Sequence, residues 1–451
     1  AAAAAGPDAL FNTLFGGLAA TAAVAKVVLA KTAPKASDST KDAAQRTAET
    51  KLKLRFLPVF WVLRMSDWLQ GPYFYEVYAS KSFGGVTASL ELVSRLFLTG
   101  FGTTAVFGPT LGRLADARGR KLGTVLFAAF YAASALSTKS PLLWVLFAGR
   151  ACGGLGTALL SAAPEAWVVG DAIRTNTTGA LGDVFGAAYA GDALVAITAG
   201  QLASMAAASR GASGPFELSV GFVTLGAILA ALTWPENKAD TSAAGNSPTI
   251  RDAFKIIAND RRIALVGAAQ ALFEGAMYVF VMQWPPALSA AIAAKYGATA
   301  AVPFGKVFSC FMVSCLLGTT AFGAAQRLAK TEASAAATFA LATGAMAVAA
   351  NAVLSSGAAG APLAALTAAF FAFEFCVGLY FPSIGTLRSK YVPDSHRTVI
   401  LAIFGIPLNV IVVSVFLSIK RLGVGGALSV STTALVRKPQ SPLGRRPSTF
   451  R

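Results

Sequence analysis

Apolar runs of about 18–25 residues follow one another along most of the chain, the length that an α-helix needs to cross a bilayer core about 30 Å thick. The strands of a membrane β-barrel would instead alternate over about 10 residues. A polar stretch at 235–262 separates six of these runs from five others. We predict spans at approximately 56–78, 88–111, 122–138, 142–165, 180–205 and 215–234 and then at 263–289, 303–325, 332–355, 361–386 and 398–419.

This pattern predicts an all-α polytopic membrane protein in two halves. The parts are an apolar segment and basic linker (1–55), an N-terminal half (56–234), a cytoplasmic central loop (235–262), a C-terminal half (263–419) and an atypical basic tail (420–451). Two helix bundles around a long loop are typical of transporters built from repeats. The strings FAGRACGGLG from Phe147 and FAFEFCVGLY from Phe371 share Phe, Ala, Cys, Gly and Leu in register, which supports such a repeat.

The two ends of the chain are less regular. Residues 9–30 are apolar and allow two interpretations, an extra helix ahead of the bundle or a targeting segment. A twelfth span is expected after 419, but the apolar stretch 424–436 is too short to cross a bilayer. Either this helix is absent or the C-terminus derives from an imperfect gene model, and we favour the second explanation.

Composition and charge agree with a membrane protein. Hydrophobic residues make up 55% of the chain and charged residues 13%, against about 25% in soluble domains. The net charge of +17 comes from basic residues that concentrate in alternate loops, which places these loops in the cytoplasm. We therefore expect the lipid bilayer, and not nucleic acid, as the partner of these charges. A monomer in the cell membrane is expected, with an organelle membrane as the alternative.

Several classes of function find no support in the sequence. The four cysteines lie in apolar runs without zinc-ligand spacing, and the only histidine, His396, lies in a polar loop. The chain has no G-x-x-x-x-G-K-[ST] loop for ATP. We expect no metal, no cofactor and no enzymatic activity.

The loop after the second predicted span reads GRLADARGRK, and it resembles the major facilitator signature G-x-x-x-D-x-x-G-R-R/K. Gly112 allows two helices to approach closely, Asp116 can meet a helix N-terminus or an arginine, and Gly119 allows positive φ. Arg120 and Lys121 hold the loop in the cytoplasm. We predict that these five residues form a conformational latch; the alternative is a generic charged turn.

Five strings, in order, resemble the eukaryotic molybdate-anion transporter family within the major facilitator superfamily. They are DWLQGPYFYEVY, GRACGGLGTALLSAAPEAW, AQALFEGAMYVFVMQWPP, FEFCVGLYFPSIGTLRSKYVP and FGIPLN. The resemblance implies a major facilitator fold and secondary active transport of molybdate or a similar oxyanion. Two features depart from the family pattern: Gly405 stands where the family has an arginine, and the last span is not recognisable.

Charged residues at membrane depth usually face a bundle interior or a water-filled cavity. Asp67 and Glu274 lie in the first helix of each predicted half, while Arg150 and Glu374 occupy matching places in the fourth. In the major facilitator fold these helices line the central cavity. We therefore predict that all four residues contribute to substrate binding, although each can instead belong to a structural ion pair.

A tetrahedral dianion needs hydrogen-bond donors. Arg150 is the predicted anchor because a guanidinium suits oxyanions, and Gln70, Tyr73, Gln270 and Asn409 are predicted neutral donors. Carboxylates in the same cavity would repel the dianion unless one is protonated, which suggests coupling to protons.

Two further points bear on the first helix and on function. Arg64 and Asp67 are spaced i,i+3 and can neutralise each other. Gly71-Pro72 is expected to break the helix where a wet or protein-lined site tolerates free backbone groups. Two other functions stay open: a porter of an organic solute such as a sugar, and a non-transporting receptor or scaffold on the same fold.

Overall fold

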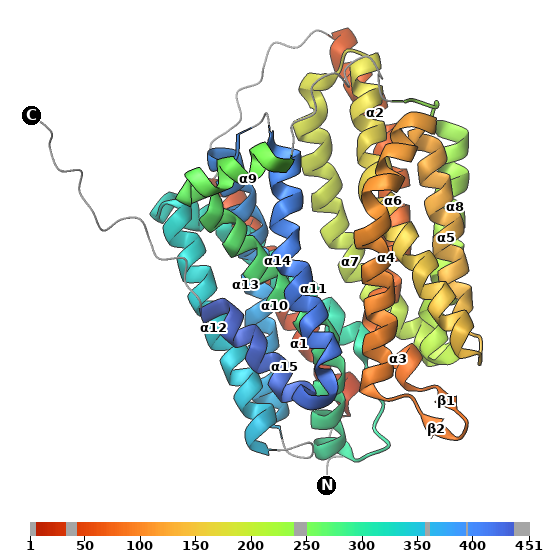
Figure 1. Cartoon of the computed structure of the whole chain (residues 1–451), viewed down its shortest axis with the longest axis vertical. Helices are drawn as coiled ribbons and strands as arrows, with labels where there is room; N and C mark the ends of the chain where they lie inside the picture. Colours follow the sequence, from red (N-terminus) through yellow and green to blue (C-terminus); the bar gives the residue numbers. More distant parts are fainter. Residues whose placement is uncertain (1–5, 33–42, 239–249, 357–360, 394–395, 437–451) are drawn as a thin grey trace, which may run out of the picture. The chain divides into compact units, whose positions relative to one another are not determined.

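The computed structural model describes residues 6–32, 43–238, 250–356, 361–393 and 396–436 (Figure 1). The chain forms two compact units. The first comprises Ala1–Gly17, Thr32–Gly245 and Pro303–Met312, and the second comprises Leu18–Lys31, Asn246–Val302 and Val313–Arg451.

The first unit contains the helices of the N-terminal half. They are α2 (Ala43–Gln70), α3 (Phe74–Ala79), α4 (Leu90–Arg118), α5 (Arg120–Ser137), α6 (Leu143–Arg174), α7 (Leu181–Arg210) and α8 (Gly214–Thr233). A short antiparallel hairpin of β1 (Ser82–Phe83) and β2 (Val86–Thr87) precedes α4. Helix α2 packs against α7 and α8, and α5 packs against α6 and α8. The indoles of Trp167 and Trp234 stack in the core of this unit, with their ring centroids 4.0 Å apart.

The second unit repeats this packing pattern. Its helices are α9 (Ile250–Asn259), α10 (Arg261–Tyr296), α12 (Thr331–Ser356), α13 (Leu363–Tyr391), α14 (Arg397–Leu417) and α15 (Ile419–Val436). Helix α10 packs against α14 and α15, and α12 packs against α13 and α15. Residues of α1 (Pro7–Thr32) and α11 (Phe304–Leu328) are shared between the two units.

The internal repeat predicted from the two strings appears as matching contacts. The hydroxyl of Thr104 on α4 donates to the carbonyl of Gly154 on α6 at 2.8 Å, and the hydroxyl of Thr319 on α11 donates to the carbonyl of Gly378 on α13 at 3.2 Å. The two glycines hold the same place in the two strings. At each of them a Cβ would collide with the backbone of the facing helix. The fourth helix of each half therefore packs in the same way.

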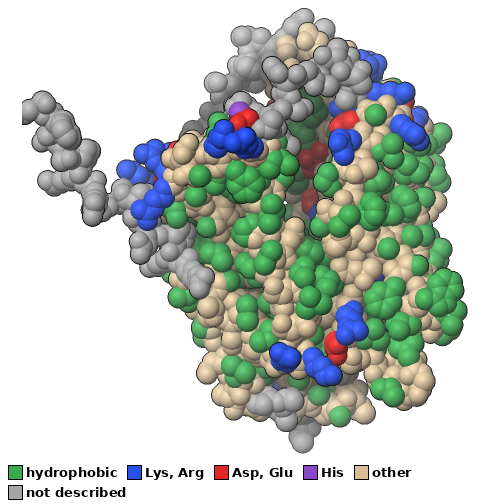
Figure 2. Space-filling model, viewed as in Figure 1, with side chains coloured by type: hydrophobic (Ala, Val, Ile, Leu, Met, Phe, Trp, Pro, Cys, Tyr) green, Lys and Arg blue, Asp and Glu red, His purple; other side chains and the backbone are tan. Residues whose placement is uncertain are grey.

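The helices have the character of membrane spans. Among the described residues, nine helical stretches are long and apolar enough to cross a bilayer, one of which, Thr178–Thr233, covers both α7 and α8. Residues 9–30, for which two interpretations were open, lie in α1, and a stretch of that helix is among the nine. Figure 2 shows hydrophobic side chains over much of the outward surface and Lys and Arg side chains near helix ends.

Two local features bear directly on the sequence-based expectations. The predicted break at Gly71-Pro72 is confirmed, since α2 ends at Gln70 and a 3₁₀ turn, Gly71–Tyr73, leads into α3. After α14, where the sequence shows no clear twelfth span, the chain is helical as α15. Its backbone is non-helical at Gly423, with φ of 61°, so the apolar pattern is interrupted close to its start. The basic tail at 437–451 lies outside the described residues.

Candidate functional site

Arg64 on α2 lies between two carboxylates of the first unit. Its Nε and Nη2 donate to Asp192 on α7 at 2.9 and 3.1 Å, and its Nη1 donates to Asp67 at 3.1 Å. The indole of Trp68 also donates to Asp192, at 2.8 Å. The i,i+3 pairing of Arg64 with Asp67 is therefore confirmed. The pairing with Asp192 was not predicted, because nothing in the local spacing links α2 to α7.

Tyr131 on α5 bonds this cluster and also feels the charge of Arg150. Its hydroxyl donates a hydrogen bond to Asp67, and its side chain is almost fully buried. The charges of both Arg150 and Arg64 act on it at short range. Tyr131 was not predicted as a site residue, although an aromatic residue with a hydroxyl inside a predicted span is a signal that sequence reasoning can use.

Arg150 on α6 stands out because its guanidinium has no carboxylate partner in the part of the chain that the structure describes. No ion pair found among the described residues includes it, whereas Arg64 pairs with Asp67 and Asp192. Its Nε is buried without a hydrogen-bond partner among the described residues. Its Cζ lies 4.5 Å from the ring centroid of Phe74, a cation–π contact. A Cβ at Gly100 would collide with the guanidinium, so this glycine on α4 makes room for it.

The predicted neutral donors of the first unit have other partners. Gln70 donates to the hydroxyl of Ser219 on α8 at 2.8 Å, and this hydroxyl donates to the carbonyl of Ser66 at 2.7 Å. Gln70 thus ties α2 to α8. Tyr73 is buried and meets Phe304 edge to face at 5.7 Å.

In the second unit, Arg388 forms hydrogen bonds with two of the predicted site residues, Gln270 and Glu274. Its Nε donates to Gln270 at 3.0 Å and its Nη2 to Glu274 at 3.1 Å, while the hydroxyl of Tyr380 donates to Glu274 at 2.9 Å. The structure thus brings Gln270 and Glu274 together on α10. Arg388 was missed because the predicted span ended at 386, whereas α13 continues to Tyr391.

Glu374 and Asn409 complete the predicted residues of the second unit. Glu374 on α13 is 6% exposed, and no hydrogen bond or ion pair found among the described residues involves it. It holds the place in its half that Arg150 holds in the other. Asn409 is half-buried on α14.

The signature loop between α4 and α5 is an ordered turn. Arg120 donates to Asp116 at 2.8 Å, and Gly119 has φ of 144°, the positive value that its place in the signature predicted. The backbone N–H groups of Lys121 and Leu122 donate to the carboxylate of Glu236 at 2.9 and 3.0 Å. Glu236 follows α8 and was not predicted. It places a negative charge at the N-terminus of α5, where the helix dipole favours one.

Gly112, the remaining signature residue, lies in van der Waals contact range of α6. A Cβ at Gly112 would lie 4.0 Å from the Cβ of Ala162, so α4 and α6 run close together here. Arg120 also donates its backbone N–H to the carbonyl of Asn237 at 3.0 Å. The signature turn is therefore attached to the segment that follows α8.

Comparisons with known proteins agree with this architecture. Residues 10–380 match the model of a family described as sugar transporters with 12 transmembrane helices. A molybdate-anion transporter of Xenopus laevis is 30% identical over 363 residues, which cover 79% of this chain and 76% of the relative. A molybdate-anion transporter of Takifugu rubripes is 28% identical over 413 residues. These residues cover 85% of this chain and 83% of the relative.

Solved structures match the fold at much lower identity. A mutant of the nucleoside transporter NupG matches with a TM-score of 0.65 at 11% identity. The match covers 85% of this chain and 96% of NupG. The POT family transporter PepTSo has a TM-score of 0.66 at 11% identity, with the same coverage. These structures show the fold alone, whereas the family match and the relatives make the protein a multi-pass membrane transporter and not an enzyme. With the family match over most of its length and the relative at 30% identity, the chain belongs to the molybdate-anion transporter family of the major facilitator superfamily.

Proposed function

We propose that the protein is a secondary transporter of molybdate or a similar oxyanion and that it works by alternating access. The observation that carries this proposal is the guanidinium of Arg150, which is held on α6, about two turns after the helix begins, without a carboxylate partner among the described residues. A charge at membrane depth costs several kcal/mol, of order 3 kcal/mol on insertion scales, unless a counter-charge or water compensates it. A bound oxyanion would supply the missing negative charge.

The other arginines inside the two units show why Arg150 differs. Arg64 is neutralised by Asp67 and Asp192, and Arg388 is neutralised by Glu274. On α4, Arg95 pairs with Glu91 at 2.6 Å. These pairs favour structural roles, whereas the fork of Arg150 remains available for the bidentate contact that guanidinium groups make with tetrahedral oxyanions.

The surroundings of Arg150 suit a bound anion. The Phe74 ring covers one face of the guanidinium and restricts its orientation. Tyr78 on α3 is fully buried beside it, and its hydroxyl has no other partner among the described residues. A tyrosine hydroxyl can donate to an oxyanion oxygen. We infer that Arg150 and Tyr78 together contact the substrate.

We propose proton coupling from the balance of charges around Tyr131. Arg64 has two carboxylates on it, so this cluster carries one negative charge in excess, and the charge of Arg150 also acts on Tyr131. Without substrate, the charge of Arg150 offsets this excess only in part, because no carboxylate among the described residues pairs with its guanidinium. A dianion at Arg150 would leave the cluster uncompensated, and a proton on Asp67 would restore part of the balance. We therefore propose that anion and proton move together.

Molybdate is favoured over sulfate-like anions or sugars by the names of the relatives, which are molybdate-anion transporters. The matching family description, sugar transporters, supports a second candidate, a sugar porter. Glu374 suits this second candidate, because a carboxylate accepts hydrogen bonds from sugar hydroxyls, whereas an ionised carboxylate repels a dianion.

Uptake of radiolabelled molybdate into cells that lack their own molybdate carrier tests the proposal. Unlabelled molybdate should abolish the signal, sulfate should compete to a measurable degree, and sugars should leave it unchanged. Labelled sugar uptake without molybdate uptake, at normal amounts of protein in the membrane, would establish the sugar porter instead.

A further inference from the structure

Helix α9 (Ile250–Asn259) lies just before a membrane span and turns aside from it. Only Asp260 separates it from α10, and the backbone of this residue is extended, with φ of −119° and ψ of 104°, so the chain changes direction between the two helices. Helix α9 packs against both α10 and α14, and Figure 1 shows it running across the axis of α14. Because α10 and α14 are long and apolar enough to cross a bilayer, a helix that turns aside at the start of α10 is placed along the bilayer surface.

One side of α9 is buried, and an apolar strip beside it is exposed. Ala253 is 0% exposed, whereas Ile250 is 65% exposed and Phe254 is 49% exposed. Residues four apart lie on the same face of a helix, so Ile250, Phe254 and the exposed Ala258 form one strip, which we call the α9 strip. Exposed apolar side chains that line up in this way mark a surface that contacts a membrane or another protein.

The direction of the α9 strip suits a helix at the bilayer surface. At 3.6 residues per turn, Ile250 and Phe254 lie about a quarter turn around the helix from the buried Ala253. The two large side chains therefore point neither into the protein nor straight away from it, but along the level at which α9 lies. For a helix at the start of a membrane span, this is the level of the lipid headgroups and the first part of the acyl chains.

Exposed arginines flank the α9 strip. Arg251 directly follows its first residue, and Arg261 and Arg262 follow α9 at the start of α10. No ion pair found among the described residues includes any of the three, whereas Lys255 pairs with Asp252 at 3.6 Å. An apolar strip with basic side chains beside it is typical of helices that lie in the membrane interface, where the charges can reach lipid phosphates.

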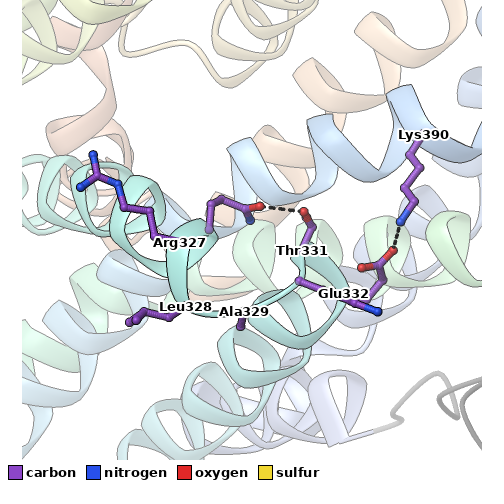
Figure 3. Close-up of a pocket in the computed structure, with 8 residues that line it drawn as sticks. Arg327, Leu328, Ala329, Thr331, Glu332 and Lys390 are labelled. Atoms are coloured by element: carbon purple, nitrogen blue, oxygen red, sulfur yellow. Dashed lines mark hydrogen bonds and ion pairs between the residues drawn. The ribbon is translucent and has the colours of Figure 1, made fainter. Parts of the chain in front are cut away.

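The turn between α11 and α12 is built differently and serves as a reference (Figure 3). It borders an open cavity of about 540 Å³, and the exposed Ala329 is part of the lining. Glu332 accepts hydrogen bonds there from Lys390 and from Tyr391, both at 2.6 Å, so an acid of the turn neutralises a nearby basic residue. A probe at Ala329 therefore reports an open, polar surface of the same unit.

We propose that α9 lies in the interface of the cytoplasmic leaflet, with the α9 strip against lipid acyl chains and the flanking arginines at lipid phosphates. The basic residues of the loop 235–262 are expected to place this end of the unit in the cytoplasm, and the cytoplasmic leaflet carries the anionic lipids. A helix of this kind buries its apolar side about 5–10 Å into the boundary between headgroups and acyl chains. Because a single residue joins α9 to α10, the contact would hold the start of α10, the helix of Gln270 and Glu274, at the level of the headgroups.

Spin labels on the full-length protein in nanodiscs of phosphatidylcholine and phosphatidylglycerol test the proposal. One label is attached at Phe254→Cys, and reference labels are attached at Asn259→Cys, on the polar face of α9, and at Ala329→Cys, after the four native cysteines are replaced by alanine. Collisions with oxygen report lipid contact, and collisions with a water-soluble nickel complex report water contact. We expect the ratio of oxygen to nickel collisions to be several times higher at position 254 than at positions 259 and 329.

The arginines are tested through the label at position 254. Arg251→Gln combined with Arg261→Gln should lower its collision ratio, because fewer charges hold α9 at the phosphates, whereas Lys330→Gln in the reference turn should leave it unchanged. Equal ratios at positions 254 and 259 would overturn the proposal. Spectral broadening at position 254 that disappears on dilution with unlabelled protein would overturn it as well, because a second copy of the chain would then cover the strip. An unchanged ratio in the double arginine variant would overturn the contact with phosphates.

Discussion

The hydroxyl of Tyr131 donates a hydrogen bond to the carboxylate of Asp67, and the same buried tyrosine lies within range of Arg150. One phenol thus bonds the acid that we propose as the proton carrier and feels the charge of the residue that we propose as the anion anchor. A change of charge at Arg150 can therefore affect the environment of Asp67.

Replacing Tyr131 by phenylalanine tests this link. Tyr131→Phe removes a hydrogen bond to a charged group, worth about 1.5–3 kcal/mol, while keeping the ring. Because Asp67 is the proposed proton carrier, the loss of this bond should change the dependence of uptake on pH. Tyr189→Phe, which removes a hydroxyl that contacts Glu165, is the control. An unchanged pH profile in Tyr131→Phe would separate the tyrosine from coupling.

The contact of Glu236 with the start of α5 predicts a loss of stability. Glu236→Gln keeps the shape of the side chain but replaces one acceptor oxygen by an NH₂ group and removes the charge at the helix N-terminus. We expect a cost of about 1 kcal/mol, the usual effect of losing a cap, seen as a lower melting temperature of the purified protein. Lys255→Gln, at an exposed ion pair with Asp252, should melt like the wild type. Equal melting of both variants would contradict a capping role.

The close packing of α13 on α11 at Gly378 predicts that a larger side chain there destabilises the protein, whereas one at Gly385 of the same helix does not. Gly378→Val would place a side chain against the backbone of α11, whereas Gly385→Val on the same helix meets open space. We expect Gly378→Val to lose about 1–3 kcal/mol or more of stability. The measurement is the fraction of protein that elutes as a single folded species in detergent. Similar behaviour of the two variants would show that α11 and α13 are not closely packed there.

Much of the fold follows from the sequence because lipid restricts the possibilities. The apolar runs predict where helices begin to within two residues, except for α2, which begins at Ala43, but α4, α6 and α10 continue seven or more residues beyond the predicted ends. Gly71-Pro72 predicts the break after α2. Helix α15 was not clear, because Gly423 interrupts a short apolar stretch. The repeat was readable because Gly154 and Gly378 are required by close helix contact, which leaves a signal in the sequence.

The partners of the charged residues were harder to predict. The i,i+3 pair of Arg64 and Asp67 is local and was foreseen, but Asp192 and Glu236 come from helices or segments far away in the chain. Hydrogen bonds across helices depend on rotation and tilt, which a hydropathy pattern does not specify. For the same reason Gln70, predicted as a substrate donor, was not foreseen to bond Ser219.

The orientation of the chain is testable by labelling. The basic residues place the loop 235–262 in the cytoplasm. A cysteine introduced as Ser242→Cys should not react with a membrane-impermeant thiol reagent in intact cells and should react after permeabilisation. A cysteine at Lys81, in the loop predicted outside, should show the reverse accessibility. Labelling of Ser242→Cys in intact cells would reverse the topology.

The central claim is that Arg150 binds the oxyanion, and binding of radiolabelled molybdate to the purified protein measures it most directly. Arg150→Lys keeps the charge but not the bidentate fork, so the dissociation constant should rise about tenfold, equivalent to about 1.4 kcal/mol. Arg150→Ala should abolish detectable binding. Arg95→Lys, at an exposed arginine already paired with Glu91, should bind as tightly as the wild type. If Arg150→Ala, folded and monodisperse, binds molybdate with wild-type affinity, Arg150 is not the anchor and the account is wrong.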